Sequence, residues 1–277
     1  MKEAIQLAEF IQQYPRLFIL TGAGVSTGSG IPAYRDKEGN WQHSPPVQHL
    51  KFMREHYARQ RYWARSLLGW PLIRDAEPGD AHRSLAQLES LGYVSQLVTQ
   101  NVDRLHQKAG SKQVVDLHGR SDVVRCMQCE SQYDRRAIHD YTAQINPQFQ
   151  LRDAEARPDG DADLETEQFE AFNVPECEQC GGILKPDVVF FGDNVPKEKV
   201  FSALDQLEQS DALLTVGSSL MVYSGFRFCK RAKEWNKPVC ALNLGKTRAD
   251  DLLSLKLDSS IEETLKGAVS GLMGSVI

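Results

Sequence analysis

Two cysteine pairs with the same spacing constrain this chain more than any other feature of its sequence. Cys126–Cys129 and Cys177–Cys180 are both C-x₂-C elements, and 47 residues separate them. Each element presents two thiolates from one tight turn, and two such turns complete the tetrahedron that Zn²⁺ prefers. Two disulfides or four unrelated thiols are the alternative. The pattern favours one structural zinc, because four thiolates leave no coordination position for a substrate.

Size and charge limit the function classes. With 277 residues, of which 41% are hydrophobic and 25% charged, the chain can bury one large core and still build a smaller module. A net charge of −5 and a pI near 5.8 argue against a nucleic-acid-binding surface. The sequence contains no run of 18 apolar residues, so we expect no membrane span. Metal-type cysteines and an N-terminus without a signal-peptide core predict a cytoplasmic protein.

Short apolar runs alternate with amphipathic helical patterns along the chain. The expected strands are Leu17–Leu20, Gln96–Val98, Ala212–Val216 and Pro238–Leu242, and the helices span 81–90, 198–209 and 223–236. This alternation predicts an α/β fold, a doubly wound parallel (Rossmann-like) sheet with a smaller inserted zinc-binding module. Cys229 and Cys240 lie in apolar surroundings and are expected in the core. Small or polar residues follow all four strands, where such folds bind ligands.

The glycine-rich loop after the first strand indicates a cofactor site. Thr21–Pro32 reads TGAGVSTGSGIP and is expected to open toward a helix. Glycines at such a turn let backbone N–H groups approach a diphosphate. The loop departs from the usual G-x-G-x-x-G fingerprint, and no clear acidic residue follows about twenty positions later. A purely structural glycine-rich turn is the alternative.

The motifs together resemble those of one enzyme family. GAGVSTGSGIPAYR, TQNVDRLH, DLHG, the two C-x₂-C pairs, KPDVVFFGD, VGSS and LNLG occur in the order found in sirtuins, the NAD-dependent protein deacylases. RYWAR at 61–65 and VYSG at 222–225 resemble the class II branch, which includes sirtuin 4. The resemblance implies a Rossmann-like NAD-binding domain over 1–120 and 186–277. It implies a zinc-ribbon module with a long insertion over 121–185, joined by a helical segment at about 45–80.

The family implies a mechanism in which His118 is the general base. The amide oxygen of an acylated lysine attacks the ribose carbon as nicotinamide leaves, and His118 then takes a proton from a ribose hydroxyl. A histidine suits this step because its ordinary pKa lies near neutrality. Asn101 and Asp103 are the other implied catalytic residues, as partners of the ribose and carboxamide. For Asp103, capping of the following helix is the alternative.

The resemblance also assigns residues to the cofactor and to the substrate. The implied NAD-binding residues are Gly22, Ala23, Gly24, Ile31, Tyr34, Arg35, Gln100, Asn101, Val102, Asp103, Gly217, Ser218, Ser219, Asn243, Leu244, Gly245 and Ile261. The acyl-lysine peptide is expected to add as a strand along Val189, Phe190 and Gly192. A buried strand without that role is the alternative for this apolar run.

The acyl group itself is less constrained. Tyr62 and Arg65 are expected to share one helix face, and they resemble the pair with which a related class reads acidic acyl chains. A surface ion pair is the alternative for Arg65. The acidic stretch 157–167 is expected to form a loop of the insertion that approaches the active site in class II relatives. A solvated loop without a role is the alternative there.

Three function classes follow from these residues. The first is an NAD-dependent deacylase that acts on acylated lysines of proteins as a monomer, with NAD and one structural Zn²⁺. The second is a protein mono-ADP-ribosyltransferase, and the third is a non-catalytic NAD- or ADP-ribose-binding module. The joint presence of Asn101, Asp103 and His118 argues against the third class.

Overall fold

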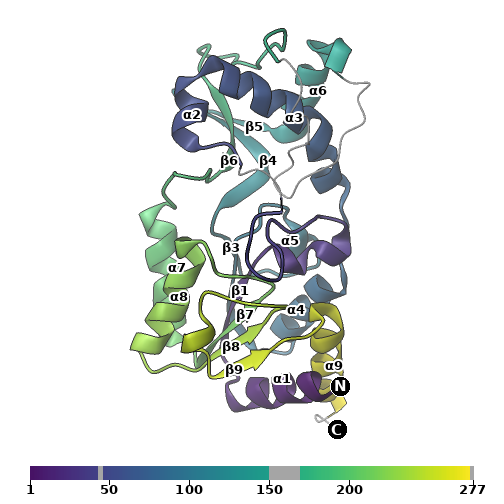
Figure 1. The fold of residues 1–277 in the computed structure, drawn as a ribbon, viewed down its shortest axis with the longest axis vertical. Helices are drawn as coiled ribbons and strands as arrows, with labels where there is room; N and C mark the ends of the chain where they lie inside the picture. Colours follow the sequence, from purple (N-terminus) through teal and green to yellow (C-terminus); the bar gives the residue numbers. More distant parts are fainter. Residues whose placement is uncertain (43–45, 150–168, 275–277) are drawn as a thin grey trace.

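A computed structural model describes residues 1–42, 46–149 and 169–274 and contains two sheets (Figure 1). All six strands of the larger sheet are parallel, in the order β3-β2-β1-β7-β8-β9. Their bounds are β1 Leu17–Thr21, β2 Val94–Thr99, β3 Val114–Asp116, β7 Ala212–Val216, β8 Val239–Leu242 and β9 Leu255–Leu257. This is the doubly wound sheet that the alternating pattern predicts.

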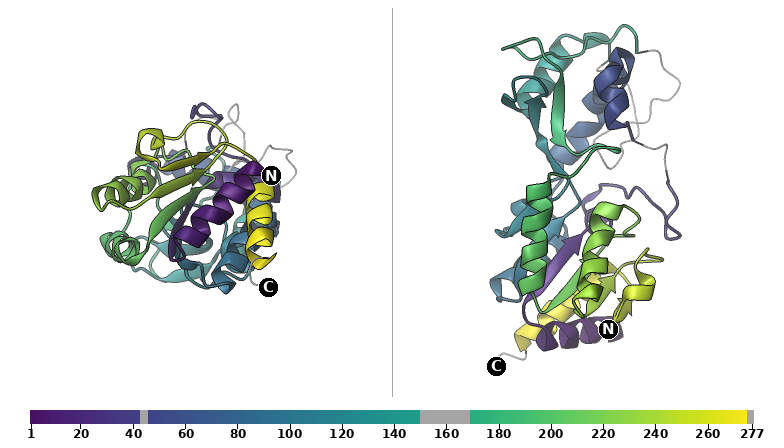
Figure 2. Two further views of the ribbon diagram at one scale, coloured as in Figure 1. Left: turned by 90° about the horizontal axis from the view of Figure 1, so that it is seen from below. Right: turned by 90° about the vertical axis from the view of Figure 1, so that its left-hand side faces the viewer.

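Helices cover both faces of this sheet. Residues of α1 (Lys2–Gln13), α4 (Asp80–Ser90) and α9 (Ile261–Gly274) share one core cluster with the strands, while α7 (Lys197–Gln209) and α8 (Tyr223–Glu234) contribute to the other. Figure 2 shows α1 beside α9. In β1, Leu17 and Ile19 point into the first cluster, and Phe18 and Leu20 into the second. Because successive side chains of a strand point to opposite faces, a fully apolar strand requires cover on both.

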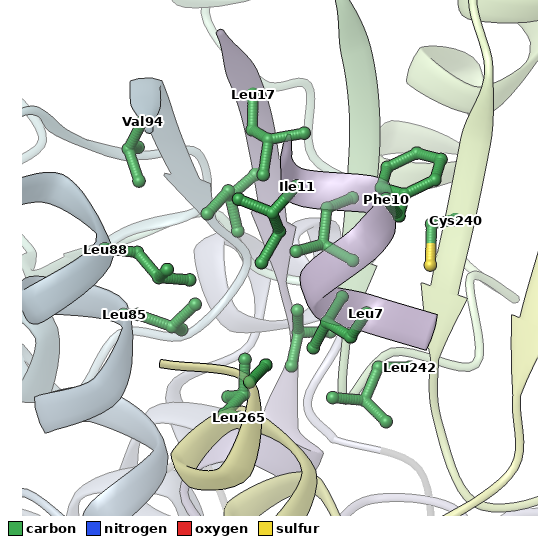
Figure 3. Packing of buried hydrophobic residues seen from close by; sticks show 14 of the residues in the cluster. Leu7, Phe10, Ile11, Leu17, Leu85, Leu88, Val94, Cys240, Leu242 and Leu265 are labelled. Carbon is green, nitrogen blue, oxygen red and sulfur yellow. The ribbon is translucent and has the colours of Figure 1, made fainter. Parts of the chain in front are cut away.

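Figure 3 shows the first of these clusters, in which Leu7 and Ile11 of α1 pack against the strands. Cys240 lies in this cluster and Cys229 in the one on the opposite face, and both thiols are fully buried. Burial disfavours the thiolate and raises the pKa of Cys229 to about 12. The prediction that both are core residues is confirmed.

The carboxyl ends of the central strands meet at one edge of the sheet. Thr21, the last residue of β1, is paired with Thr99 of β2 on one side and with Val216 of β7 on the other. The strand order reverses between β1 and β7, so the loops that follow them diverge there. Ligands of open α/β sheets bind at such a switch point.

The smaller sheet is antiparallel, in the order β5-β4-β6, and lies at the opposite end of the molecule (Figure 1). Its strands are β4 Gly119–Cys126, β5 Gln132–Asp134 and β6 Leu184–Val188, and the helices near it are α2 His49–Arg54, α3 His56–Asp75 and α6 Arg135–Gln144. One apolar cluster joins α2 and α3 to this sheet and includes Phe52, Trp63 and Val124. The predicted domain boundaries fall inside β4 and β6, and the division into domains stays a prediction.

Shorter elements complete the described chain. They are α5 Leu105–Lys108 and the 3₁₀ turns η1 Ala23–Val25, η2 Thr27–Ser29, η3 Pro147–Phe149 and η4 Asp250–Leu252. The expectation that the glycine-rich loop opens into a helix is corrected, since two 3₁₀ turns follow β1 instead. None of the described helices is both long and apolar enough to cross a bilayer. The acidic stretch 157–167 lies outside the described residues.

Candidate functional site

The loops after the strands place most of the predicted cofactor residues along one edge of the larger sheet. Gly22–Gly24 follow β1, Gln100–Asp103 follow β2, Gly217–Ser219 follow β7, and Asn243–Gly245 follow β8. His118 stands between β3 and β4, at the point where the chain leaves the larger sheet for the smaller one. The sequence-predicted residues therefore come from five separate loops and converge on the switch point.

His118 is half-buried, and both of its ring nitrogens have protein partners. Nδ1 lies 3.0 Å from the main-chain oxygen of Gln100, and Nε2 lies 2.7 Å from Oγ of Ser224. A carbonyl oxygen can only accept, so Nδ1 carries the proton and Nε2 is the nitrogen with the lone pair. Ser224 then donates to Nε2. The proton-accepting nitrogen is thus held by a single hydroxyl, which must turn away before Nε2 can take a proton from a substrate.

The protonation state of His118 is set by its surroundings. Burial lowers the pKa of His118 to about 4; the hydrogen bond to Gln100 opposes this shift, and the charges of Arg227 and Lys199 add to it. The imidazole is therefore neutral at neutral pH and available as a base. A neutral imidazole can accept a proton, although a pKa this low makes it a weaker base than a histidine with its ordinary pKa.

Asn101 and Asp103 meet at a residue that the sequence did not single out, Ser26. Oγ of Ser26 donates to Oδ2 of Asp103 at 2.7 Å and accepts from Nδ2 of Asn101 at 3.0 Å. Asn101 also donates to the oxygen of Gly22. The other Asp103 oxygen accepts from N of Leu105, so Asp103 also holds the start of α5, as the alternative interpretation expects. Burial raises the pKa of Asp103, and its hydrogen bonds from Leu105 and Ser26 oppose the rise.

Two histidines continue this buried network. His82 and His106 are 0% and 1% exposed, and their ring centroids lie 4.9 Å apart. Nε2 of His82 contacts Ser26 Oγ at 3.4 Å, and Nε2 of His106 contacts Thr21 Oγ1 at 2.8 Å. Thr21 in turn donates to Thr99. α4 carries the His82 ring, which is buried beside Ser26 of the cofactor loop.

Removing the Ser26 hydroxyl should loosen this network. In Ser26→Ala, the buried Asp103 and Asn101 side chains each lose a partner, which should lower the unfolding free energy by about 2–3 kcal/mol. NAD affinity should fall as well, since both side chains belong to the predicted cofactor site. Urea unfolding and NAD calorimetry measure the two effects. Ser29→Ala is the matched control, because Ser29 Oγ has no hydrogen-bond partner within the described chain; equal effects of the two changes would contradict the network's role.

Acid should destabilise the fold through His82 and His106. Burial lowers the pKa of His82 to about 4 and that of His106 well below its ordinary value of 6.5. Below pH 6.5 the unfolded chain therefore binds protons that the folded chain does not. The unfolding free energy should fall by about 1.4 kcal/mol per pH unit for each ring as pH drops from 6.5 toward 4.

Urea unfolding at several pH values measures this slope. His82→Gln should reduce it by about one proton, and His56→Gln, at an exposed position, should leave it unchanged. An unchanged slope in His82→Gln would show that this ring stays charged in the folded protein.

The glycines of the first loop fit tightly against the turn after β7. A Cβ added at Gly22 would lie 2.8 Å from the oxygen of Gly217 and from Cβ of Ser218, and one at Gly24 would lie 2.9 Å from Cα of Gly217. Gln100 ties the same turn to the end of β1, because its Nε2 donates to Ser218 Oγ and to the oxygen of Thr21. These glycines therefore serve the packing of two loops, in addition to any approach of a diphosphate.

Tyr34, Arg35 and Ile31 of the predicted cofactor residues lie in the loop at 30–42, whereas Ile261 lies apart from it. The Arg35 guanidinium stacks 4.0 Å from the ring centroid of Trp41 and donates to the oxygen of Gly39, and burial lowers its pKa. Tyr34 also packs on Trp41. Ile31 and Ile261 are buried in apolar clusters, Ile31 beside Ile73 and Leu105, and Ile261 in the core between α9 and the sheet.

A pocket lies beside the predicted peptide segment, on the side of the smaller sheet. Its cavity volume is about 50 Å³, and its walls come from the loop residue Tyr34, the segment Val188–Phe191, Tyr62 and Trp70 of α3, and Arg135 of α6. N of Val189 donates to the oxygen of His118 at 2.8 Å, so the predicted peptide segment starts beside the predicted base. Beyond it, N of His49 donates to the oxygen of Phe191, and the left-handed Gly192 (φ 79°) ends the segment.

Of the predicted pair on α3, Tyr62 lines this pocket and Arg65 does not. The Tyr62 ring lines it and packs against Phe52 and Phe190 with centroids 5.3 and 5.2 Å away. Arg65 is 4% exposed and is not among the lining residues. Its side chain is therefore buried rather than at the surface, and pairing with a carboxylate stays open as the alternative. A role of Arg65 toward an acyl carboxylate stays a prediction.

The four predicted metal ligands form one cluster at the far end of the smaller sheet. Their sulfur atoms all lie within 4.8 Å of one another, and Cys126–Cys180 and Cys129–Cys177 are 3.5 and 3.6 Å apart. A Zn–S bond of about 2.3 Å places the sulfurs of a tetrahedral site about 3.8 Å apart. A Cβ added at Gly182 would lie 2.8 Å from the Cys126 sulfur. The cluster therefore fits a structural Zn²⁺, and the missing side chain at Gly182 leaves room for the Cys126 sulfur.

Comparison with known proteins identifies the family. The model of the Sir2 family matches residues 22–224. The chain belongs to the Sir2 family. A curated Sir2-type relative from Bradyrhizobium diazoefficiens, NAD-dependent protein deacetylase 2, is 56% identical over 94% of this chain and 95% of its own. NAD-dependent protein deacylase Sirt4 of Drosophila melanogaster is 44% identical over 94% of this chain and 84% of its own.

Solved Sir2 structures share the fold over nearly the whole chain. A Sir2 enzyme bound to acetylated peptide superposes with a TM-score of 0.78 at 26% identity and covers 99% of both chains. A complex described as Sir2-p53 peptide-NAD⁺ gives 0.77 at 27% identity and covers 98% of both. The sirtuin resemblance read from the motifs is therefore confirmed, and it extends beyond the motifs to the architecture.

Proposed function

We propose that this protein is an NAD-dependent protein-lysine deacylase that transfers the acyl group from lysine to ADP-ribose and releases nicotinamide. The observation that carries the proposal is the neutral His118 at the switch point of the sheet. Its Nε2 accepts a hydrogen bond from Ser224, and its main-chain oxygen accepts one from N of Val189, in the predicted peptide segment. Its relatives are named deacetylases and deacylases that depend on NAD.

The side chains along the sheet edge have the chemistry that NAD requires. The guanidinium of Arg35 suits the diphosphate, and the amide of Asn101 and the carboxyl of Asp103 suit the nicotinamide ribose and carboxamide. Ser218, Ser219, Asn243, Leu244 and Gly245 are placed to hold the adenosine half. Bound NAD supplies the ribose carbon that accepts the acyl oxygen and the nicotinamide that departs.

The protein's own part in the reaction is positioning and one proton transfer. Main-chain groups beside Val189 align the substrate peptide as a strand. The Gln100 carbonyl fixes the tautomer of His118, so that Nε2 is the atom that receives the hydroxyl proton. Once charged, the ring lies in surroundings that favour its neutral form, which promotes return of the proton in a later step.

The partners follow from the same site. We infer that the substrates are acylated lysines within proteins, as in the peptide complexes of the structural neighbours. We infer that the protein acts as a monomer in the cytoplasm, and its net negative charge argues against binding to nucleic acid or anionic membranes.

Product analysis tests the proposal directly. Incubation with NAD and an acetyl-lysine peptide should yield one nicotinamide and one O-acetyl-ADP-ribose for each lysine released, as measured by mass spectrometry. A mass increment of ADP-ribose on protein, without any need for acyl-lysine, would show a transferase instead. NAD binding by calorimetry with no nicotinamide release would show a binding module.

A further inference from the structure

A buried cation lies in the wall of the pocket beside the predicted peptide segment. Arg135 is the first residue of α6 and is 2% exposed. One guanidinium nitrogen, Nη2, donates to Oγ of Ser66. The other two, Nε and Nη1, are buried and have no hydrogen-bond partner, and no carboxylate pairs with Arg135 among the residues that the structure describes.

Aromatic rings surround the charge without neutralising it. The guanidinium carbon lies 4.6 Å from the ring centroid of Trp63 and 5.4 Å from that of Trp70. Burial lowers the pKa of Arg135, while the charge of the Tyr62 phenol and a hydrogen bond with it raise that pKa; an arginine remains charged in a protein. Stacking on aromatic faces offsets only part of the unfavourable free energy of a buried charge. Two nitrogens of this cation, Nε and Nη1, therefore remain available to an anion.

The pocket provides the place for that anion. Arg135 lines it together with Tyr62, Trp70 and Val189, and the backbone of Val189 bonds to that of His118. The pocket lining combines apolar and aromatic side chains with this one guanidinium. The two features together match a short hydrocarbon chain that ends in a negative charge.

We propose that Arg135 is a specificity residue that binds the terminal carboxylate of an acidic acyl group on the substrate lysine. This inference rests on the proposed deacylase function and names its substrate class. The methylene groups of the acyl chain pack between Tyr62 and Trp70, and the carboxylate accepts hydrogen bonds from nitrogens that otherwise have none. Hydrogen bonds between ionised groups are about twice as strong as neutral ones.

A pair of acyl-lysine peptides of one shape tests this assignment. One carries a glutaryl group, and the other carries its monoamide, in which the terminal carboxylate is a carboxamide. We expect the wild-type protein to favour glutaryl by about 10- to 100-fold in kcat/KM. Arg135→Met should bring the ratio close to one and leave acetyl-lysine turnover within a few fold, and Arg135→Lys should restore part of the preference.

The controls separate this residue from its neighbours. Arg136→Met removes the adjacent, exposed arginine and should leave the ratio unchanged. Arg65→Met tests the other buried arginine of this region. Circular dichroism and zinc content report whether each variant is folded. A wild-type ratio near one overturns the inference whatever the variants do, and so does a preference that survives Arg135→Met or is lost only in Arg65→Met.

Peptide binding keeps the inference distinct from the proposed function. Fluorescence anisotropy of labelled glutaryl and monoamide peptides measures the same preference without turnover. If no acyl-lysine peptide is processed but glutaryl binds more tightly and Arg135→Met removes that advantage, the deacylase proposal fails and the assignment of Arg135 stands. If acetyl-lysine is processed and the two peptides bind equally, the assignment fails and the deacylase proposal stands.

Discussion

Replacing His118 with alanine is expected to lower kcat/KM for an acetyl-lysine peptide by about 10²- to 10⁴-fold, the usual contribution of a general base. The change removes the imidazole that lies between the Gln100 carbonyl and the Ser224 hydroxyl, and the Gln100 carbonyl loses the group that it orients. NAD affinity should change little, because the ring contributes a proton-accepting atom rather than the main binding contacts. Initial rates and calorimetry with the same preparations measure both quantities.

The control for this variant is His56→Ala, which removes an exposed imidazole at the start of α3 and should retain full activity. The pH profile adds a second check. Because burial lowers the pKa of His118 to about 4, wild-type kcat/KM should remain high as pH falls through 6.5 and decline only toward that lower value. Near wild-type activity in His118→Ala would show that another group accepts the proton.

Replacing Cys129 with alanine is expected to remove the metal and unfold the smaller body. Zinc bound by four thiolates contributes about 10–16 kcal/mol of apparent binding free energy in small zinc domains, and that free energy is lost from folding when a ligand is deleted. Cys126 and Cys177 lie in the same apolar cluster as Phe172 and Leu184, so loss of the metal should loosen the packing around them. Deacylation should fall too, although no cysteine of the cluster lines the pocket.

Metal analysis, thermal unfolding and peptide turnover measure these effects together. Cys229→Ala is the matched control, since it deletes a buried thiol from the core of the larger sheet and should keep one zinc per chain. A Cys129→Ala protein with full activity and unchanged unfolding would contradict a structural metal site.

The larger sheet could be predicted from the sequence because its signals are local. Fully apolar runs such as Ala212–Val216 require cover on both faces, and the predicted helix at 198–209 is found as α7 at 197–209 with only one residue added. The bend of the first loop into two 3₁₀ turns could not be predicted. Its glycines are placed by the distant turn at Gly217, and no spacing within the loop reveals that contact.

In the candidate site, too, some residues could be predicted from the sequence and others could not. His118 and the four cysteines lie in motifs, so their types and spacing reveal them. Ser26 and His82 acquire their roles only when α4 packs beneath the cofactor loop, and a lone histidine on an amphipathic helix carries no sign of it. Arg135 stands in no motif at all. The Tyr-x-x-Arg spacing on α3 indicates Arg65, whereas the arginine that lines the pocket is Arg135 on α6.

The central claim is that His118 acts after nicotinamide has left, and a nicotinamide exchange experiment tests it most directly. His118→Ala is incubated with NAD, acetyl-lysine peptide and isotope-labelled nicotinamide. Label should enter NAD, because the first step does not need the base, while O-acetyl-ADP-ribose should be nearly absent. Formation of O-acetyl-ADP-ribose at the wild-type rate in this variant would contradict the account.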